Sequence, residues 1–152
     1  MDETYVKVGG SWRYVYRAVD QHGQVIDVYV SRRRNTEAAR RFFDRALADH
    51  SRPVEVVTDK AQALLAAVDE VLPDALPITD RYASNRVEAD HGRLKARLRP
   101  MRHLRCDQTA ATVIRGHAFV QNLRRGHYEL GTDARCHHLQ LAAAFDELVD
   151  MI

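Results

Sequence analysis

The sequence predicts an α/β fold, in which a mixed sheet carries helices on its faces. Its first third alternates apolar and polar residues with the two-residue period of β-strands. Apolar residues then recur at helical spacing, interrupted by two short strand-like runs, and from Ser84 to the end the pattern stays helical. The 152 residues contain no internal repeat and no low-complexity linker. We therefore expect residues 1–152 to form a single domain.

Three β-rich runs at the start of the chain are joined by short turns. They cover residues 4–8, 11–19 and 25–30, with Gly9-Gly10 in the first turn and the sequence DQHG in the second. Short turns favour antiparallel neighbours, so we expect an antiparallel meander.

Helices and strands alternate in the middle of the chain. Asn35 can cap a helix that carries an apolar stripe along one face. The run VEVVTD is typical of a strand covered on both faces, and a helix follows from Gln62 to Leu72, where Pro73 stops it. Residues 75–79 are predicted to form a short edge strand, because Pro77 would remove a donor from the ladder.

Three helices are predicted in the last part of the chain, from Ser84 or Asn85 to about Arg99, from about Gln108 to Tyr128, and from about Leu139 to Met151. The first has three rows at helical spacing. The row expected to face the core is Val87, His91, Leu94 and Leu98, and we expect His91 to be a packed residue rather than a general base. The adjacent row is Glu88, Gly92, Lys95 and Arg99. A third row, expected to exchange surface salt bridges, is Arg86, Asp90, Arg93 and Arg97.

Composition excludes several classes of protein. Hydrophobic residues make up 45% and charged residues 29% of the chain, as in a globular protein that buries a core. The sequence lacks an apolar run of membrane-spanning length and a signal peptide, so we expect no membrane partner. Two cysteines, Cys106 and Cys136, are too few for a disulfide scaffold, which favours a cytoplasmic protein. The run Cys136-His137-His138 lacks the paired spacing of structural zinc sites.

The charge is unevenly placed along the chain. The net charge is only +2, yet eight Arg and Lys residues against two acids lie between Arg81 and Arg105. Such a block indicates either a polyanion partner or a solvated helix face.

Three acidic residues have notable positions. Asp2 opens the first strand, Asp59 ends the fourth, and Glu88 lies one turn into the helix after the fifth. If the first and fourth strands are neighbours, the three carboxylates converge at one edge of the sheet, where a divalent cation would offset their repulsion. Oxygen ligands of this kind suit Mg²⁺ or Mn²⁺, and two such ions can cleave a phosphodiester. On placement alone, a solvated terminus for Asp2 and a turn or cap role for Asp59 remain open.

The chain also resembles a known family. The segments DETYVKVGGSWRYVYRAVD, TDKAQALL and SNRVEADHGRLKARLRP are similar to the catalytic core of bacterial insertion-sequence transposases of the DDE class, and the match runs in order from Asp2 to about Tyr128. The resemblance implies a ribonuclease H-like fold, as in retroviral integrases, with a mixed five-stranded sheet and helices on both faces. It also implies that Asp2, Asp59 and Glu88 bind two Mg²⁺ or Mn²⁺ ions.

The implied function is DNA transposition, by metal-dependent cleavage and strand transfer at the ends of the element. Transposon ends and target DNA are the implied partners, and the family works as oligomers on DNA. The expected phosphate contacts come from Arg81, Arg86, Lys95 and Arg99. The helix-turn-helix region that family members carry before the first aspartate is expected to be absent.

Two other functions stay open on the sequence. One is a DNA-binding remnant without catalysis, since only 28 residues separate Asp59 from Glu88, fewer than the family usually has. The other is a structure-selective, metal-dependent nuclease on the same fold.

Overall fold

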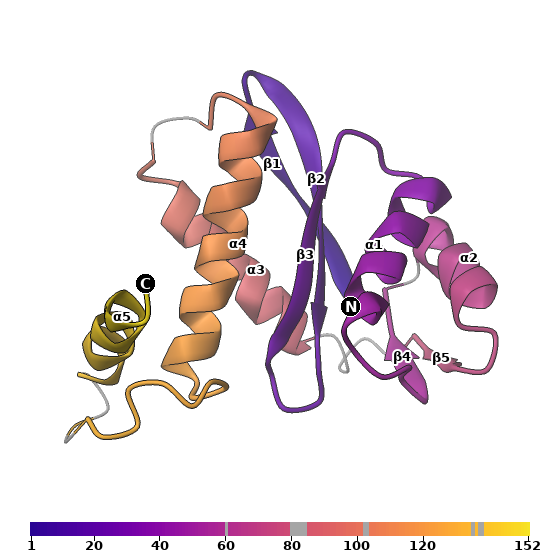
Figure 1. Cartoon of the computed structure of the whole chain (residues 1–152). Helices are drawn as coiled ribbons and strands as arrows, with labels where there is room; N and C mark the ends of the chain where they lie inside the picture. The colour runs from indigo at the N-terminus through magenta and orange to yellow at the C-terminus, as the bar shows by residue number, and fades with distance from the viewer. Residues whose placement is uncertain (60, 80–84, 102–103, 135, 137–138) are drawn as a thin grey trace.

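The computed structural model describes residues 1–152 except 60, 80–84, 102–103, 135 and 137–138. Its strands and helices follow the predicted order β-β-β-α-β-α-β-α-α-α (Figure 1). No helix in the part of the chain that the structure describes is long and apolar enough to cross a membrane. The elements are β1 (Asp2–Val8), β2 (Ser11–Val19), β3 (Val25–Ser31), α1 (Thr36–Ala48), β4 (Glu55–Val57), α2 (Gln62–Val71), β5 (Leu76–Ile78), α3 (Asn85–Leu98), α4 (Asp107–Arg124) and α5 (Gln140–Asp150).

The first three strands form the predicted antiparallel meander. Asp2 pairs with Arg17 at one end of the β1–β2 hairpin, and Val8 pairs with Ser11 at the other. The turn between these strands needs glycine, because Gly9 and Gly10 have φ angles of 55° and 81°, which residues with a Cβ rarely adopt. A Cβ on Gly9 would also lie 2.8 Å from the Arg105 carbonyl oxygen. The meander prediction is confirmed.

The prediction of one five-stranded sheet is wrong. The described strands form a three-stranded sheet in the order β1-β2-β3 and a separate parallel pair, β4-β5. One contact links the two sheets, because the Met1 ammonium donates a hydrogen bond to the carbonyl oxygen of Val57 at the end of β4. β4 has only three residues, and each of them is registered with a residue of β5. The pairing therefore does not develop into a ladder.

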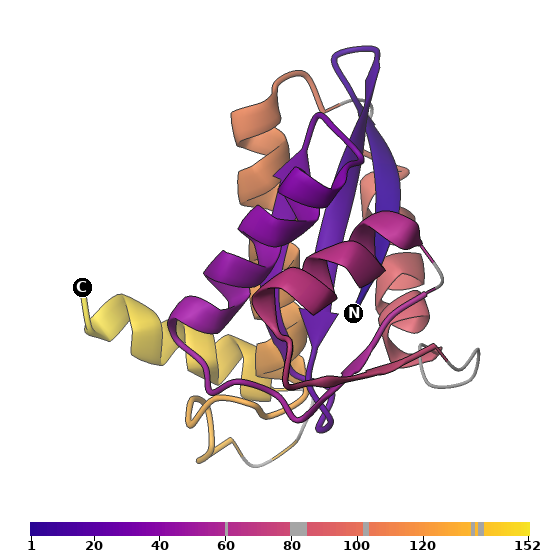
Figure 2. The ribbon, with the colours of Figure 1, turned by 90° about the vertical axis from the view of Figure 1, so that its right-hand side faces the viewer.

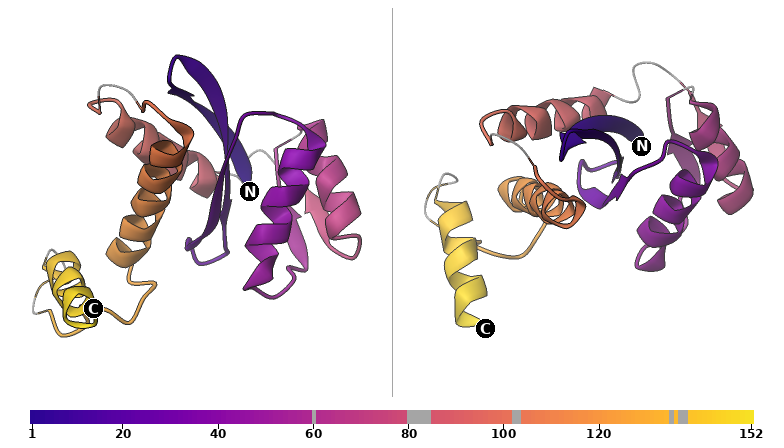
Figure 3. Two further views of the ribbon diagram at one scale, coloured as in Figure 1. Left: turned by 45° about the horizontal axis from the view of Figure 1, so that its top comes forward. Right: turned by 90° about the horizontal axis from the view of Figure 1, so that it is seen from above.

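Helices cover both faces of the three-stranded sheet. α1 and α2 lie on one side, and α3 and α4 lie on the other (Figures 2 and 3). Neighbouring residues of β2 point to opposite faces, so Tyr16 is buried in the core beneath α1 and α2 while Val15 is buried in the core beneath α3 and α4. The sheet is thus the middle layer of three. The expectation of helices on both faces is confirmed for these strands.

Local signals set the ends of the helices. The Asn35 side chain accepts a hydrogen bond from the amide of Ala38 at 3.0 Å, which confirms it as the cap of α1. α4 ends at Arg124, four residues before the predicted end. Gly126 follows with a φ of 71°, a conformation that terminates helices.

One buried amide holds α4 against the edge of β3. The Asn122 side chain accepts a hydrogen bond from the Val25 amide at 2.8 Å and donates one to the Val25 carbonyl at 2.9 Å. The amide side chain therefore pairs with the backbone of Val25 as a neighbouring strand would, and it satisfies the buried N–H and C=O groups of Val25.

We expect Asn122→Ala to lower the free energy of unfolding by about 2 kcal/mol, because Val25 loses both buried partners. Urea denaturation followed by circular dichroism measures the change. Arg124→Ala, on the exposed side of the same helix, is the matched control and should change stability by less than about 0.5 kcal/mol. Equal losses in the two variants would contradict this role for Asn122.

Candidate active site

The three sequence-predicted acids come from three different elements. Asp2 is the first residue of β1, Asp59 lies two residues beyond the end of β4, and Glu88 lies in the first turn of α3. An Asp59 oxygen accepts a hydrogen bond from the amide of Ala61 at 3.1 Å, which shapes the turn into α2. Glu88 is exposed to solvent.

The charges of these residues act on one another. The pKa of the Asp2 carboxyl is raised to about 6, mainly by burial and further by the negative charges of Asp59 and Glu88. The Glu3 amide donates a hydrogen bond to Asp2 at 2.7 Å, which opposes the rise in pKa without cancelling it. Asp59 and Glu88 therefore both act on the charge of Asp2.

The chemistry of this donor set fits a divalent cation. Carboxylate oxygens are the ligands that Mg²⁺ and Mn²⁺ prefer, and the shared repulsion at Asp2 is what a cation would relieve. The ligands are not yet close enough together, because no group of three acidic, histidine or cysteine side chains among the described residues could hold one ion. The arrangement thus supplies suitable ligands from separate elements rather than a preformed cage.

A buried histidine lies beside Asp2. His91 of α3 is 6% exposed, as predicted for a packed residue, and its Nδ1 atom is 3.6 Å from an Asp2 oxygen. Burial, with the charges of Arg17 and Lys95, lowers the pKa of His91 to about 4. The ring is therefore neutral at pH 7, and 3.6 Å is too long for a hydrogen bond. His91 therefore gives the Asp2 carboxylate no positive charge at neutral pH, and the nearby Met1 ammonium only partly opposes the rise in the pKa of Asp2.

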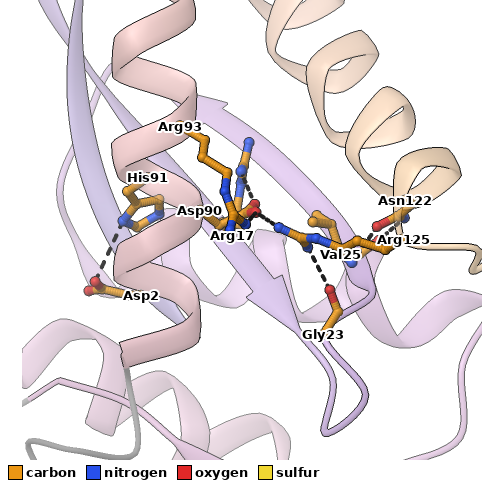
Figure 4. Close-up of polar contacts among 9 residues, drawn as sticks. All are labelled: Asp2, Arg17, Gly23, Val25, Asp90, His91, Arg93, Asn122 and Arg125. Atoms are coloured by element: carbon orange, nitrogen blue, oxygen red, sulfur yellow. Dashed lines mark hydrogen bonds and ion pairs between the residues drawn. The ribbon is translucent and has the colours of Figure 1, made fainter. Parts of the chain in front are cut away.

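The prediction of a surface salt bridge for Asp90 is wrong. Its side chain is 0% exposed and forms ion pairs with Arg17 of β2, which is also fully buried, and with Arg125 after α4 (Figure 4). Arg93, one turn along α3, approaches Asp90 only to 3.8 Å. Arg125 also donates a hydrogen bond to the Gly23 carbonyl at 2.6 Å. Asp90 therefore joins α3 to β2, to the turn after β2 and to the end of α4.

Two opposing effects determine the charge of Asp90. Burial raises the pKa of its carboxyl, but Arg17 and Arg125 lower the pKa by more, so the net shift is below the ordinary value. The carboxylate is consequently ionised and doubly paired. It is committed to the fold and is not available as a metal ligand.

The predicted phosphate-binding residues are only partly described. Lys95 and Arg99 lie on the exposed row with Glu88 and Gly92, although α3 ends at Leu98, so Arg99 follows the helix. The Lys95 ammonium lies 4.8 Å from the centre of the Tyr5 ring. Arg81 lies outside the described residues, as does the side chain of Arg86.

One basic residue near the acids was missed from the sequence. Arg34, in the connection after β3, pairs with Glu3 of β1. Its pKa is raised, first by the hydrogen bond to Glu3 and by the charge of Glu3, and also by that of Asp59. The run Arg32-Arg33-Arg34 was the available signal, but sequence alone does not show which of the three arginines turns towards the acids.

Comparison with solved structures shows which fold carries this site. A chain in the cryoEM structure of a simian T-cell lymphotropic virus intasome in complex with the PP2A regulatory subunit B56 gamma matches 92% of this chain and 52% of its own length. The TM-score is 0.59 at 17% sequence identity. The two chains share a mixed α/β fold, which is consistent with the expected ribonuclease H-like class.

Sequence comparison then identifies the family. The model of the DDE domain matches residues 1–127, so the chain belongs to the DDE-domain family of insertion-sequence transposases. Two relatives from Staphylococcus aureus, the transposases for the insertion sequence-like element IS431mec and for IS257 in transposon Tn4003, are each 34% identical over 103 residues. The match covers 64% of this chain and 46% of each relative, so the chain spans about half the length of these relatives.

We expect Asp90→Ala to lower the free energy of unfolding by about 3–5 kcal/mol, because it leaves the buried guanidinium of Arg17 without a counter-charge. Chemical denaturation at pH 7 measures the loss. Arg93→Ala is the matched control, since it removes the exposed, distant partner and should cost less than about 1 kcal/mol.

The stabilisation by Asp90 should also depend on pH. Because the folded-state pKa lies below the unfolded value of about 3.8, the stabilisation is complete above that value and is lost as the pH falls through the lower folded pKa. The stability gap between the unmodified chain and Asp90→Asn should therefore narrow in acid. A gap that stays constant down to pH 2 would contradict an ionised Asp90 in the native state.

Proposed function

We propose that this chain is the catalytic core of a DNA transposase, which cleaves phosphodiester bonds at the ends of an insertion sequence and joins the freed 3′ ends to target DNA. The observation that supports this most is that, in a chain of the DDE-domain family, the pKa of Asp2 is raised by burial and further by the negative charges of Asp59 and Glu88. Two relatives of the chain are named as transposases of insertion sequences.

We further propose that the three carboxylates hold two Mg²⁺ or Mn²⁺ ions, with Asp2 and Asp59 contacting the ions and Glu88 completing the second site. Ions in such a pair activate an attacking hydroxyl and stabilise the leaving oxygen of the phosphodiester. His91 would keep the inner side of Asp2 dry without supplying a competing charge, since it is buried and neutral at pH 7. Arg34 would supply a positive charge beside the acids.

The DNA contacts in this proposal come mainly from α3. Lys95 and Arg99 lie on the exposed row that contains Glu88, so phosphates near a bond held at the acids would meet these cations. Arg81 and Arg86 are proposed to add phosphate contacts. We also propose that the chain acts as a homo-oligomer that brings transposon ends and target DNA together.

We expect Mn²⁺ to bind the purified protein with an affinity that Asp59→Ala and Glu88→Ala both abolish, because each substitution removes a ligand that no neighbour replaces. Isothermal titration calorimetry measures the binding. Asp146→Ala, which removes an exposed carboxylate of α5, is the control and should bind as the unmodified chain does. No heat of binding beyond that of the Asp59→Ala variant would overturn the proposed metal site.

Metal affinity should fall in acid. Protons compete with the metal for Asp2, and a carboxyl with a pKa of about 6 is about nine-tenths protonated at pH 5, so the affinity should be about tenfold weaker at pH 5 than at pH 7. Calorimetry at the two pH values measures the change. In Asp2→Asn the overall affinity should be lower and this part of the pH dependence should disappear; an unaltered pH dependence would assign the titration to another group.

DNA cleavage separates the proposal from the other two functions. In the presence of Mn²⁺, the unmodified chain should nick linear DNA at the element end and then join that end to a second duplex. The Asp59→Ala variant should do neither. Salt-sensitive binding without cutting would instead indicate a DNA-binding remnant. Cutting of branched DNA without joining would indicate a structure-selective nuclease.

A further inference from the structure

We propose that Tyr5 and Trp12 form a stacking platform for the bases of an unpaired DNA strand, with Lys7 and Lys95 contacting its phosphates. The choice of DNA as the ligand rests on the proposed function. The platform itself is inferred from exposed rings, their register on the sheet and the charges around them.

The two rings are neighbours on one face of the β1–β2 hairpin. Tyr5 lies opposite Tyr14 and Lys7 lies opposite Trp12, so Tyr5 and Trp12 are diagonal neighbours across the two strands. Their ring centres are 5.2 Å apart and their planes are nearly perpendicular, at 89°. Tyr5 is 56% exposed and Trp12 is 55% exposed. The hairpin therefore presents a continuous aromatic surface to solvent.

This surface continues the core face of the sheet beyond its covering helices. On β2 the same face carries Trp12, Tyr14 and Tyr16, and these become steadily more buried along the strand, from exposed through half-buried to fully buried. Tyr16 stacks on Phe42 of α1, at 5.9 Å between ring centres, whereas Trp12, near the turn of the hairpin, stays exposed. Contiguous exposed apolar surface can mark an interaction site.

The charge around the rings favours a phosphate chain. The Lys7 ammonium lies 5.8 Å from the centre of the Trp12 ring, and the Lys95 ammonium lies 4.8 Å from that of Tyr5. Neither lysine forms an ion pair with a carboxylate among the residues that the structure describes. Exposed cation–π contacts are weak, so a phosphate could take the ammonium while a base takes the ring face that it leaves.

The platform lies close to the proposed active site along two elements. Tyr5 is three residues beyond Asp2 on β1, roughly 10 Å at about 3.3 Å per residue. Lys95 is seven residues beyond Glu88 on α3, again roughly 10 Å at 1.5 Å per residue. The Asp2–His91 and Tyr5–Lys95 contacts show that β1 and α3 advance side by side. Asp2 and Tyr5 lie on opposite faces of β1, because three residues separate them, so a DNA strand with a phosphodiester at the acids would pass around the β1 edge of the three-stranded sheet, beside Lys95, to reach the rings.

Stacking distinguishes a nucleic-acid strand from other polyanions. An acidic peptide could neutralise both lysines but would leave the ring faces without a planar partner, whereas every base has a face that stacks on an aromatic ring. Bases inside an intact duplex are already stacked on each other, so the platform would select an unpaired segment.

The test uses Trp12, which is the single tryptophan of the chain and so reports on the platform by its fluorescence. Oligothymidylate of about 12 nucleotides, a length that fits the usual site sizes, is titrated in EDTA. We expect quenching that saturates and weakens with salt. An abasic deoxyribose phosphate strand of equal length should quench far less, and so should polyglutamate.

Variants locate the binding to the rings. We expect Tyr5→Ala to weaken oligothymidylate binding about tenfold, measured by anisotropy of a labelled strand, and Tyr5→Phe to bind as the unmodified chain does. Phe145→Ala, which removes an exposed aromatic side chain from α5, is the matched control and should leave binding unchanged. Circular dichroism confirms that each variant is folded.

Three results would overturn the proposal: equal quenching by the abasic strand or by polyglutamate, unchanged affinity in Tyr5→Ala, or a clear preference for oligouridylate over oligothymidylate. Because the titration excludes metal, it does not depend on cleavage. Asp59→Ala should bind oligothymidylate normally even though it is expected not to cut DNA. Stacking without metal-dependent cleavage would uphold the platform and reject the proposed catalysis, and cleavage without stacking would do the reverse.

Discussion

The fold depends on one buried carboxylate. Asp90 has no exposure to solvent, and an ionised side chain in that position is tolerated only because Arg17 and Arg125 both pair with it. The three residues come from α3, from β2 and from the end of α4, which are far apart in sequence. Arg125 also binds the Gly23 carbonyl, so the turn between β2 and β3 is drawn into the same network. Any displacement of α3 from the sheet would separate buried charges.

This pairing also fixes the rotation of α3, and so determines which residues face the proposed site. Successive helical residues are about 100° apart, since 3.6 residues complete one turn. With Asp90 directed at Arg17, the next residue, His91, lies against Asp2, while Glu88 and Lys95 stay on an exposed row. A structural carboxylate that contacts no substrate thus positions the part of α3 on which the proposed chemistry depends.

The order of elements could be predicted because it rests on local patterns. The meander, the Asn35 cap and the apolar row of α3 are all determined within a few residues of sequence. The break between β1 and β4 could not be predicted, because pairing between strands that are far apart in the sequence does not follow from any local pattern. The prediction for Asp90 was wrong because arginines at helical spacing on both sides of it are typical of a solvated helix face. Its buried partner Arg17 lies 73 residues away in the sequence. The metal ligands stay predictions.

Asp2 and Asp90 show how surroundings separate two carboxylates that burial affects in the same way. At Asp90 two guanidinium groups outweigh the cost of burial, the pKa is lowered and every interaction is internal. At Asp2 the adjacent imidazole is neutral, and burial with the charges of Asp59 and Glu88 outweighs the Glu3 amide and the Met1 ammonium, so the pKa is raised. A cation brought to Asp2 would relieve a repulsion that the Met1 ammonium offsets only in part. The same cation at Asp90 would have to displace arginines that the fold requires. The difference in charge balance, rather than the number of acids, is therefore the reason for proposing the Asp2 edge, and not Asp90, as the place for chemistry.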